Sequence, residues 1–317
     1  MRLLLTGAAG LVGSAVCEEA LRRGFEVLAL YRQDPVASRP GLTALQVDLA
    51  EPTRLTEALL EFFPDAIINA TGVTEAADCD ADPALAERLN VALPKHLAML
   101  AHHLSARFIH FSTDNVFDGQ NPPYRPTDVP APLHLYGQLK VMSEREVLAG
   151  TKGSATILRL PLVLGNSPSA RRSVHERLLH ALAAGQTPTC FTDVVRHTVS
   201  TRSVAEVAVE LCERKLTGLF HWTGEQSHTR HAIAAAILEF FSLPDRLIAA
   251  GTCDNPKYPK DLRLNTETLV GKVRARPESF PEQLGDLACP PELREWLAAS
   301  QMRPVDAVER FVQGRDF

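Results

Sequence analysis

The sequence lacks three features that would assign it to a common class of proteins. Its six cysteines form no CxxC pair, so we expect neither a zinc site nor a disulfide framework, but reduced thiols in the cytoplasm. No run of about 18 uninterrupted apolar residues occurs, so we expect no membrane-spanning helix. The net charge is −5 and the longest basic cluster is Arg171-Arg172, so nucleic-acid binding has little support.

The first residues allow two interpretations. Met1-Arg2 followed by three leucines could begin a signal peptide. The alternative is a buried strand from Arg2 to Thr6 that runs into a phosphate-binding loop, and the regularly spaced glycines behind it favour this second reading. The chain is 45% hydrophobic and 22% charged, and its length predicts about two domains with a large core.

The first half of the chain alternates short apolar strands with helices. The pattern predicts strands near residues 3–5, 25–31, 44–47, 66–68, 108–111 and 155–160, and helices near 11–23, 52–63, 83–104 and from 135. Pro94 should kink or split the helix near 83–104. Strands that are apolar throughout and alternate with helices indicate an α/β fold with a doubly wound parallel sheet. After Pro161 the pattern weakens, with helices expected near 174–184, 204–214, 231–241 and 291–299 and one strand near 218–222.

A glycine-rich motif joins the first strand to the first helix. The segment TGAAGLVG places Gly7, Gly10 and Gly13 at the spacing TGxxGxxG. The glycines allow a tight turn and a close approach of the backbone to a pyrophosphate, which the N–H groups at the helix start, including those of Leu11 and Val12, then bind. We expect a Rossmann-type dinucleotide site here, and a glycine turn without function is the alternative.

The end of the second strand favours NADP over NAD. An NAD site usually has an acidic residue there for the ribose 2′-hydroxyl, whereas this chain has Tyr31 followed by Arg32, and arginine suits a 2′-phosphate. Asp34 lies two residues further on and is a competing group. Asp48, followed by Leu49, lies either near the adenine or at the start of a helix as a favourable charge. The expected cofactor is therefore NADP(H).

The strand and helix pattern, with the glycine motif in its first half, predicts two regions in the chain. Residues 1–160, with a returning segment of about 200–222, are expected to form the NADP-binding Rossmann domain. Residues 161–199 and 223–317 are expected to form a smaller, mixed substrate-binding region.

A YxxxK pattern, Tyr136 to Lys140, opens the helix after the fifth strand. Residues four apart share a helix face, so a lysine ammonium beside the phenol would lower the tyrosine pKa toward working pH. Ser112 and Thr113 close the fifth strand, and such folds bind ligands at the carboxyl ends of their strands. These residues are therefore candidates for an acid–base site, and a surface Tyr/Lys pair without a role is the alternative.

The residues around this pattern resemble the dTDP-4-dehydrorhamnose reductase family of extended short-chain dehydrogenases/reductases. The segment FSTDNVFDG at 111–119 resembles that family's STDYVFDG, and PAPLHLYG at 130–137 resembles the loop that follows it. Asn69-Ala70-Thr71 matches a fourth-strand NxA motif, and Leu89-Asn90-Val91 matches a helix motif. The resemblance covers roughly residues 1–280. The chain is also similar to the regulatory beta subunit of methionine adenosyltransferase.

The resemblance implies a mechanism and a set of site residues. NADPH would give a hydride to a ketone carbon of a nucleotide-linked sugar, and Tyr136 would protonate the alkoxide. Lys140 would tune the tyrosine and bind the nicotinamide ribose, and Thr113 would donate a hydrogen bond to the carbonyl oxygen. The cofactor would also contact Ala70, Thr71, Gly72 and Ser112, and the substrate would contact Thr74, Asn115 and Arg196.

The residues expected to contact the substrate depart from the family pattern, whereas those expected to contact the cofactor keep it. Asn115 and Val73 each replace a family tyrosine, and residues 158–165 lack the family tryptophan, so aromatic surface that would stack on a sugar is lost. The sequence thus predicts an NADPH-dependent reductase of a 4-keto nucleotide sugar or a similar keto sugar. A catalytically weak, NADP-binding regulatory subunit of a partner enzyme is the alternative.

Assembly and metal binding have fewer indications. Family members pair through two helices, here about 83–104 and 135–150, so a homodimer is expected by analogy. His228 and His231 are spaced as metal ligands can be, but no Glu or His completes a set, so no metal is expected.

Overall fold

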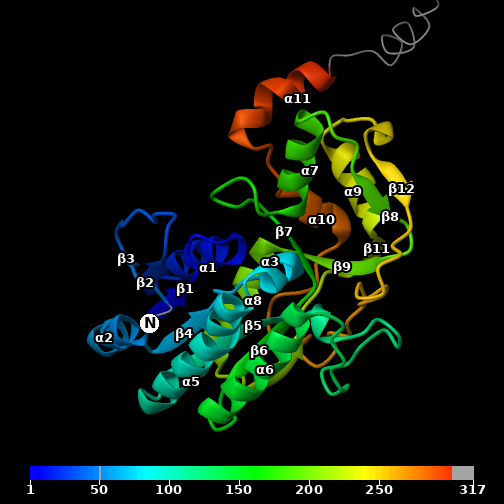
Figure 1. Cartoon of the computed structure of the whole chain (residues 1–317). Helices are drawn as coiled ribbons and strands as arrows, with labels where there is room; N and C mark the ends of the chain where they lie inside the picture. The colour runs from blue at the N-terminus through cyan, green and yellow to red at the C-terminus, as the bar shows by residue number, and fades with distance from the viewer. Residues whose placement is uncertain (50, 302–317) are drawn as a thin grey trace, which may run out of the picture.

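The computed structural model describes residues 1–49 and 51–301, and a seven-stranded sheet forms its centre (Figure 1). The strand order is β10-β6-β5-β4-β1-β2-β3, and every neighbouring pair is parallel. The chain starts in the middle, fills one edge and then crosses to the other, so the predicted doubly wound fold is confirmed. The strands are β1 (Arg2–Thr6), β2 (Glu26–Tyr31), β3 (Leu42–Gln46), β4 (Ala66–Asn69), β5 (Arg107–Thr113), β6 (Thr156–Leu160) and β10 (Gly218–His221).

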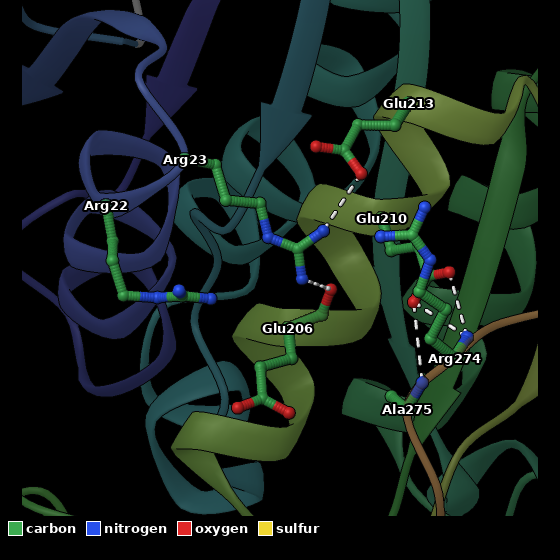
Figure 2. Close-up of a pocket in the computed structure, with 7 residues that line it drawn as sticks. All are labelled: Arg22, Arg23, Glu206, Glu210, Glu213, Arg274 and Ala275. Atoms are coloured by element: carbon green, nitrogen blue, oxygen red, sulfur yellow. Dashed lines mark hydrogen bonds and ion pairs between the residues drawn. The ribbon is translucent and has the colours of Figure 1, made fainter.

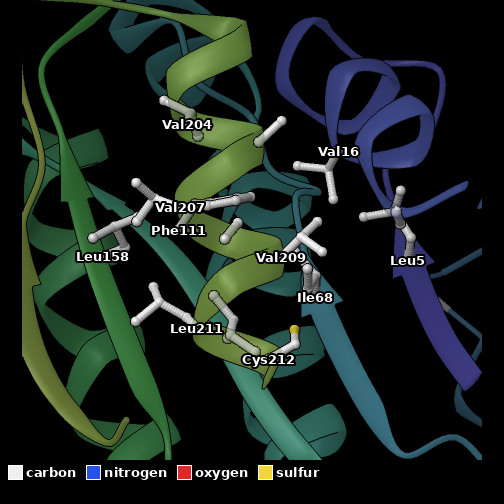
Figure 3. Packing of buried hydrophobic residues seen from close by; sticks show 14 of the residues in the cluster. Leu5, Val16, Ile68, Phe111, Leu158, Val204, Val207, Val209, Leu211 and Cys212 are labelled. Atoms are coloured by element: carbon white, nitrogen blue, oxygen red, sulfur yellow. The ribbon is translucent and has the colours of Figure 1, made fainter. Parts of the chain in front are cut away.

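Two layers of helices cover this sheet. The helices α1 (Leu11–Arg22) and α8 (Thr201–Arg214) pack their apolar residues on one face (Figure 3). The helices α2 (Pro52–Phe62), α5 (Leu93–His103) and α6 (Leu135–Gly150) cover the other face (Figure 1). Both faces of the central strands are therefore buried, which explains their apolar sequences, whereas the edge strand β3 is mostly exposed.

The helix predicted over 83–104 is interrupted before Pro94, as expected. It consists of α4 (Pro83–Glu87), a π-helical turn (Arg88–Ala92) and α5, and the short helix α3 (Ala76–Ala81) precedes it. Proline has no N–H to donate to the carbonyl four residues earlier, so the α-helical hydrogen-bond pattern is interrupted. The wider π-helical turn lies at this interruption.

The remaining residues form a smaller region at one end of the molecule (Figure 1). The sequence indicated only helices and one strand after residue 161, but the structure adds a three-stranded sheet, β11-β9-β7, and a two-stranded sheet, β12-β8. That expectation was wrong because most of these strands are three residues long and only partly buried, so no apolar run marks them. Residues 302–317, which the predicted region included, lie outside the described residues.

The elements of the smaller region are β7 (Leu162–Leu164), β8 (Thr189–Phe191), β9 (Val195–Ser200), β11 (Ser227–Thr229), β12 (Ala249–Gly251), α7 (Val174–Ala183), α9 (Arg230–Phe240), α10 (Phe280–Gly285) and α11 (Arg294–Gln301). Among the described residues, no helix is long and apolar enough to cross a membrane. All six cysteines are described, and each is a free thiol.

A buried ion pair fixes α6 on the sheet. Arg159 on β6 donates to the two carboxylate oxygens of Glu144 at 2.8 Å and 2.7 Å, and both side chains are almost fully buried. Glu144 also accepts from Ser112 Oγ at 2.6 Å, and the guanidinium lies over the Phe117 ring, 5.0 Å from its centroid. Charges buried this deeply are tolerated only when they are paired and hydrogen-bonded, so they restrict α6 to one rotation and one height on the sheet.

Arg159→Leu should lower the free energy of unfolding by about 3 to 5 kcal/mol, because Glu144 is then buried without its counter-charge. Urea unfolding followed by circular dichroism measures the change. Lys95→Ala is the control: the Lys95–Glu146 pair also joins a neighbouring helix to α6, at 2.9 Å, but both side chains are exposed. Its loss should cost less than about 1 kcal/mol, and equal effects of the two substitutions would contradict the assignment.

Candidate functional site

The residues singled out in the sequence meet at the carboxyl edge of the large sheet. The loops after β1 and β4 touch each other there, as do the turn after β5 and the first turn of α6. Parallel strands end at the same edge, which brings these four segments together.

The loop after β1 requires glycine at two positions for steric reasons. Gly7 has a φ of 69°, and a Cβ there would lie 2.6 Å from a carbonyl oxygen of the loop after β4. A Cβ on Gly13 would lie 2.1 Å from Gly7 O, so the first turn of α1 packs directly on the loop. The N-cap, Gly10, provides no side-chain cap, and the first turn has no acidic residue. The first N–H groups of α1, including those of Leu11 and Val12, therefore suit an anion such as a pyrophosphate.

A buried asparagine holds the loop after β4. Asn90 accepts from Val73 N and donates to Val73 O, both at 2.9 Å. A Cβ on Gly72 would lie 2.7 Å from Asn90 Oδ1, so this position has no room for a side chain. Thr71 Oγ1 is buried and has no hydrogen-bond partner among residues 1–49 and 51–301, which leaves a polar atom for a ligand. Thr74, further along the loop, is exposed.

The end of β2 carries the groups expected to distinguish NADP from NAD. Arg32 and Asp34 are both exposed. Asp34 Oδ2 accepts from Arg172 Nη2 at 3.2 Å, so an arginine before α7 offsets the charge of the competing acid. Asp48 is exposed at the end of β3, whereas its neighbour Leu49 is buried. The positive group at the β2 end is thus Arg32, as the sequence indicated.

The hydroxyl of Thr113 is oriented by its neighbours at the end of β5. Thr113 Oγ1 accepts from Asn115 N at 3.2 Å and from Asn115 Nδ2 at 3.1 Å, and it donates to Asp114 Oδ1 at 3.2 Å. Both acceptor directions of the oxygen are used, so its one hydrogen, which is donated to Asp114, is the group that can turn toward a ligand. Stabilising a carbonyl oxygen requires such an oriented donor.

His134 links this cluster to the first turn of α6. Burial lowers its pKa, so the ring is neutral near pH 7. His134 Nδ1 accepts from Gly137 N at 3.1 Å, so the proton is on Nε2, which donates to Asn115 Oδ1 at 3.1 Å. Tyr136 stacks nearly parallel to the imidazole, with ring centroids 6.1 Å apart. Sequence reasoning missed His134, although its N-cap position two residues before Tyr136 was a usable signal.

Tyr136 and Lys140 do not interact as the YxxxK pattern suggested. Burial raises the pKa of Tyr136, while a hydrogen bond to Thr113 lowers it and the Asp114 carboxylate raises it further. Lys140 Nζ donates instead to Phe111 O at 2.6 Å, in the strand beneath the helix. The expected lowering of the tyrosine pKa is therefore not found, because the lysine nitrogen is engaged by the sheet. A protonated tyrosine is nevertheless the form that a general acid requires.

Ser112 and Arg196 lie in surroundings that the sequence did not indicate. Ser112 Oγ donates to Glu144, so a contact of Ser112 with a cofactor would use its backbone. Arg196 is buried rather than exposed. Its guanidinium donates to the backbone carbonyls of Val195, Pro259 and Lys260.

Asp114 is a buried carboxylate at the centre of the cluster, and sequence reasoning gave it no role. Its Oδ1 accepts from Thr113 and Asn115, whereas Oδ2 has no hydrogen-bond donor in the described part of the chain and lies 4.0 Å from Arg196 Nε. Burial, against a smaller opposing effect of Arg196, raises the pKa of Asp114 from 3.8 to about 6. The second oxygen is therefore a buried acceptor that no donor of the described residues uses.

Two hollows lie at the opposite, amino edge of the sheet. The first, of about 570 Å³, is lined by three arginines, three glutamates and an alanine near the C-terminal ends of α1 and α8 (Figure 2). Arg23 donates to Glu213 at 2.9 Å, and Glu210 accepts from Arg274 N at 2.8 Å. This hollow is not part of the candidate site, because it lies at the amino edge of the sheet and its positive and negative side chains balance each other. The second hollow is lined by residues before β4 and β5 and after α8.

The fold is that of an extended short-chain dehydrogenase/reductase. The sequence matches the family described as RmlD substrate binding domain over residues 1–288, and the chain belongs to that family. The resemblance inferred from the motifs is thus confirmed.

Individual relatives agree with this assignment. The chain is 33% identical over 253 residues to methionine adenosyltransferase 2 subunit beta of Xenopus laevis, which covers 77% of this chain and 73% of that protein. It is 32% identical over 295 residues to a probable low-salt glycan biosynthesis reductase of Haloferax volcanii, with coverages of 90% and 97%. A hypothetical dTDP-4-dehydrorhamnose reductase from Sulfolobus tokodaii has a TM-score of 0.78 at 25% identity, covering 91% of this chain and 100% of that one. The dTDP-4-dehydrorhamnose reductase of Bacillus anthracis, solved with NADP, has a TM-score of 0.77 at 18% identity, with coverages of 89% and 95%.

Asp114→Asn should raise the free energy of unfolding at neutral pH. A carboxyl group whose folded pKa exceeds its unfolded value costs stability once it ionises, so the cost grows between about pH 4 and pH 6 and is complete above pH 6. The amide should gain about 1 to 3 kcal/mol at pH 7.5 and much less at pH 4. Urea unfolding at both pH values measures this gain. Asp78→Asn, on the exposed side of α3, is the control, and a gain that does not depend on pH would contradict the account.

Proposed function

We propose that this protein is an NADPH-dependent reductase of a keto sugar carried on a nucleotide. The observation that carries the proposal is the hydrogen-bond chain His134–Asn115–Thr113 beside Tyr136. It fixes the Thr113 hydroxyl beside a protonated phenol at the edge of the sheet that also holds the glycine loop. A relative described as a probable reductase spans nearly the whole chain, and similar folds have been solved with NADP or NAD, which supports the proposal.

A dinucleotide fits the carboxyl edge of the sheet. The loop of Gly7, Gly10 and Gly13 would hold the pyrophosphate on the N-terminus of α1, and the buried, orphaned Thr71 Oγ1 suits a polar group of the same ligand. When bound, the nicotinamide supplies the hydride. Further contacts of the cofactor are proposed for Leu11, Val12, Asp48, Leu49, Ala70, Gly72, Ser112, Tyr136 and Lys140.

NADP is the proposed form of the cofactor. Arg32 stands at the end of β2, where a 2′-phosphate would lie, and arginine suits a phosphate. Asp34, which could hold the 2′-hydroxyl of NAD, is already paired with Arg172. We also propose that residues 1–160 with 200–222 bind the cofactor and that the remaining residues bind the substrate.

Tyr136 acts as the general acid in the proposed reaction. Its phenol, kept protonated by burial, gives its proton to the carbonyl oxygen as negative charge develops there. Thr113 turns its hydroxyl hydrogen from Asp114 to the same oxygen, while the two hydrogen bonds from Asn115 hold the hydroxyl oxygen in place. Lys140 is the proposed partner of the nicotinamide ribose.

The proposed substrate is a 4-keto nucleotide sugar, bound by polar groups rather than by aromatic stacking. Asn115 and Val73 stand where family tyrosines would provide ring surface. Asp114 Oδ2 and the second lone pair of Asn115 Oδ1 are the acceptors proposed for sugar hydroxyls, and the exposed Thr74 offers another polar group. Arg196 is proposed to act through Asp114, whose charge it offsets from 4.0 Å.

Tyr136→Phe should lower kcat by about 10²- to 10⁴-fold with a 4-keto nucleotide sugar, because the general acid is lost. The affinity for NADPH should change little, and fluorescence titration measures it separately from NADPH oxidation. Tyr124→Phe is the matched control: Tyr124 donates to Asp118 at 2.6 Å and stacks on Phe117, away from Thr113. Unchanged kcat in Tyr136→Phe would remove the tyrosine from the mechanism.

The second candidate is a regulatory subunit that binds NADP(H) with little turnover. It is favoured by the 33% identity to methionine adenosyltransferase 2 subunit beta and by the altered substrate half of the site. Size-exclusion chromatography of this chain mixed with a methionine adenosyltransferase catalytic subunit tests it. Co-elution, with no NADPH oxidation on any keto sugar, would establish this candidate, whereas separate elution with turnover would establish the reductase.

A homodimer and a cytoplasmic location are further proposals. The helices α5 and α6 lie side by side (Figure 1), and they expose Met99 and Met142. Exposed apolar side chains on adjacent helices agree with the pairing expected from the family resemblance.

A further inference from the structure

A loop of the smaller region reaches the end of β2, where the phosphorylated ribose of the cofactor is proposed to lie. The loop joins β7 to α7 and extends from the smaller region toward the β2 side of the large sheet (Figure 1). Arg172, close to the end of this loop, makes the contact, because its Nη2 donates to Asp34 Oδ2 at 3.2 Å. Sequence reasoning gave this arginine no role.

A second ion pair joins the smaller region to the large sheet on the other side of the glycine loop. Arg177 on α7 pairs with Glu75 in the loop after β4. The strand order is β4-β1-β2, so the two ion pairs lie on either side of the loop after β1. The segment from Arg172 to Arg177 therefore spans the part of the strand edge where a dinucleotide on the N-terminus of α1 is proposed to lie.

A buried carboxylate fixes the backbone that carries Arg172. Glu176 is 2% exposed, and its Oε2 accepts from Arg172 N at 2.8 Å, from Ser173 N at 2.9 Å and from Ser167 Oγ at 2.6 Å. Its Oε1 accepts from Ser167 N at 2.6 Å. These bonds hold the loop in one shape, so a ligand that binds Arg172 does not have to order the backbone first.

The Arg172–Asp34 pair itself is easily exchanged for a stronger one. The two side chains are 53% and 56% exposed, and ion pairs between side chains this exposed contribute little to stability. A phosphate group carries about two negative charges and three acceptor oxygens, and a guanidinium can bind two of these oxygens at once. A phosphate next to Arg172 would therefore compete well with the single charge of Asp34.

The charges at the end of β2 give this exchange a consequence for the choice of cofactor. Arg32 and Asp34 carry opposite charges, and both are exposed. Together they provide no net attraction for a 2′-phosphate, and a carboxylate at this place by itself suits the 2′-hydroxyl of NAD. Arg172 supplies the additional positive charge that favours the phosphate.

We propose that Arg172 is a specificity-determining residue for the cofactor: it leaves Asp34 and binds the 2′-phosphate of NADP together with Arg32. The smaller region then contributes to the selection of NADP over NAD, in addition to its proposed role toward the substrate. The inference rests on the dinucleotide-binding part of the proposed function and not on the reduction of a sugar.

Fluorescence titrations of NADPH and of NADH, without any sugar, test the inference through the ratio of the two dissociation constants. Arg172→Ala should weaken NADPH binding by about 10-fold or more, because charge-assisted hydrogen bonds to the phosphate are lost. NADH binding should stay unchanged or become tighter, because Asp34 is then free to accept from the 2′-hydroxyl. An equal loss of affinity for both cofactors would show a merely structural role and would overturn the inference.

Arg171→Ala is the matched control. Arg171 lies in the same loop and carries the same charge, but its Nη2 lies 3.6 Å from Glu292 Oε1, within the smaller region. The ratio of the two dissociation constants in this variant should equal that of the wild type. A change of the ratio as large as that in Arg172→Ala would reduce the effect to the net charge of the loop and would contradict the proposal.

A comparison in the Asp34→Asn background separates contact with the phosphate from neutralisation of the carboxylate. Arg172→Ala should still weaken NADPH binding there by about fivefold or more, because the phosphate contact does not need Asp34. An effect that disappears in this background would overturn the contact. An unchanged ratio in Arg172→Ala would overturn the inference and leave the proposed function standing, whereas a wild-type protein that binds neither cofactor would refute the dinucleotide site itself.

Discussion

The position of α6 depends on polar side chains buried where an apolar layer would otherwise lie. We call these side chains the polar seam; they are His110, Ser112, Lys140, Ser143, Glu144 and Arg159. Apolar contacts tolerate small rotations of a helix, but buried charges and hydrogen-bonding groups lose several kcal/mol when their partners move. The seam therefore sets the rotation of α6 over β5 and β6, and Tyr136 is placed at the end of β5 as a consequence.

A second chain of hydrogen bonds connects the start of α6 with the end of β5. The imidazole of His134 caps α6 and holds the Asn115 amide, which in turn orients the Thr113 hydroxyl. Asp114 completes the cluster but lowers stability, because its ionised form is buried and one of its oxygens has no hydrogen-bond donor among the described residues. Polar groups left incompletely satisfied at such an edge are typical of sites that bind a ligand.

Local sequence predicted the features that depend on local chemistry. The glycine spacing around Gly7 and Gly13 reflects steric limits that only glycine meets, and the interruption before Pro94 follows from a missing N–H. The order of apolar strands and helices was sufficient for the doubly wound sheet, because the central strands are buried on both faces.

The features that sequence reasoning missed depend on contacts between distant segments. The buried His110 contacts Asn69 on the neighbouring strand, and the lysine of YxxxK turns to Phe111 O because the strand offers it a carbonyl. Arg196 is buried by carbonyls more than 60 residues away in the sequence. The short strands of the smaller region pair only in the folded chain, so no periodicity marked them.

The central claim is that Thr113 and Tyr136 form a site that reduces a ketone on a nucleotide sugar. The most direct measurement uses NADPH carrying deuterium at the transferable position of the nicotinamide, incubated with the protein and 4-keto nucleotide sugars. Mass spectrometry of the sugars then reports whether a deuteride has been transferred. The account predicts that one sugar gains two hydrogens, one of them deuterium on the former carbonyl carbon. Bound NADPH that transfers no deuterium to any keto sugar would contradict it.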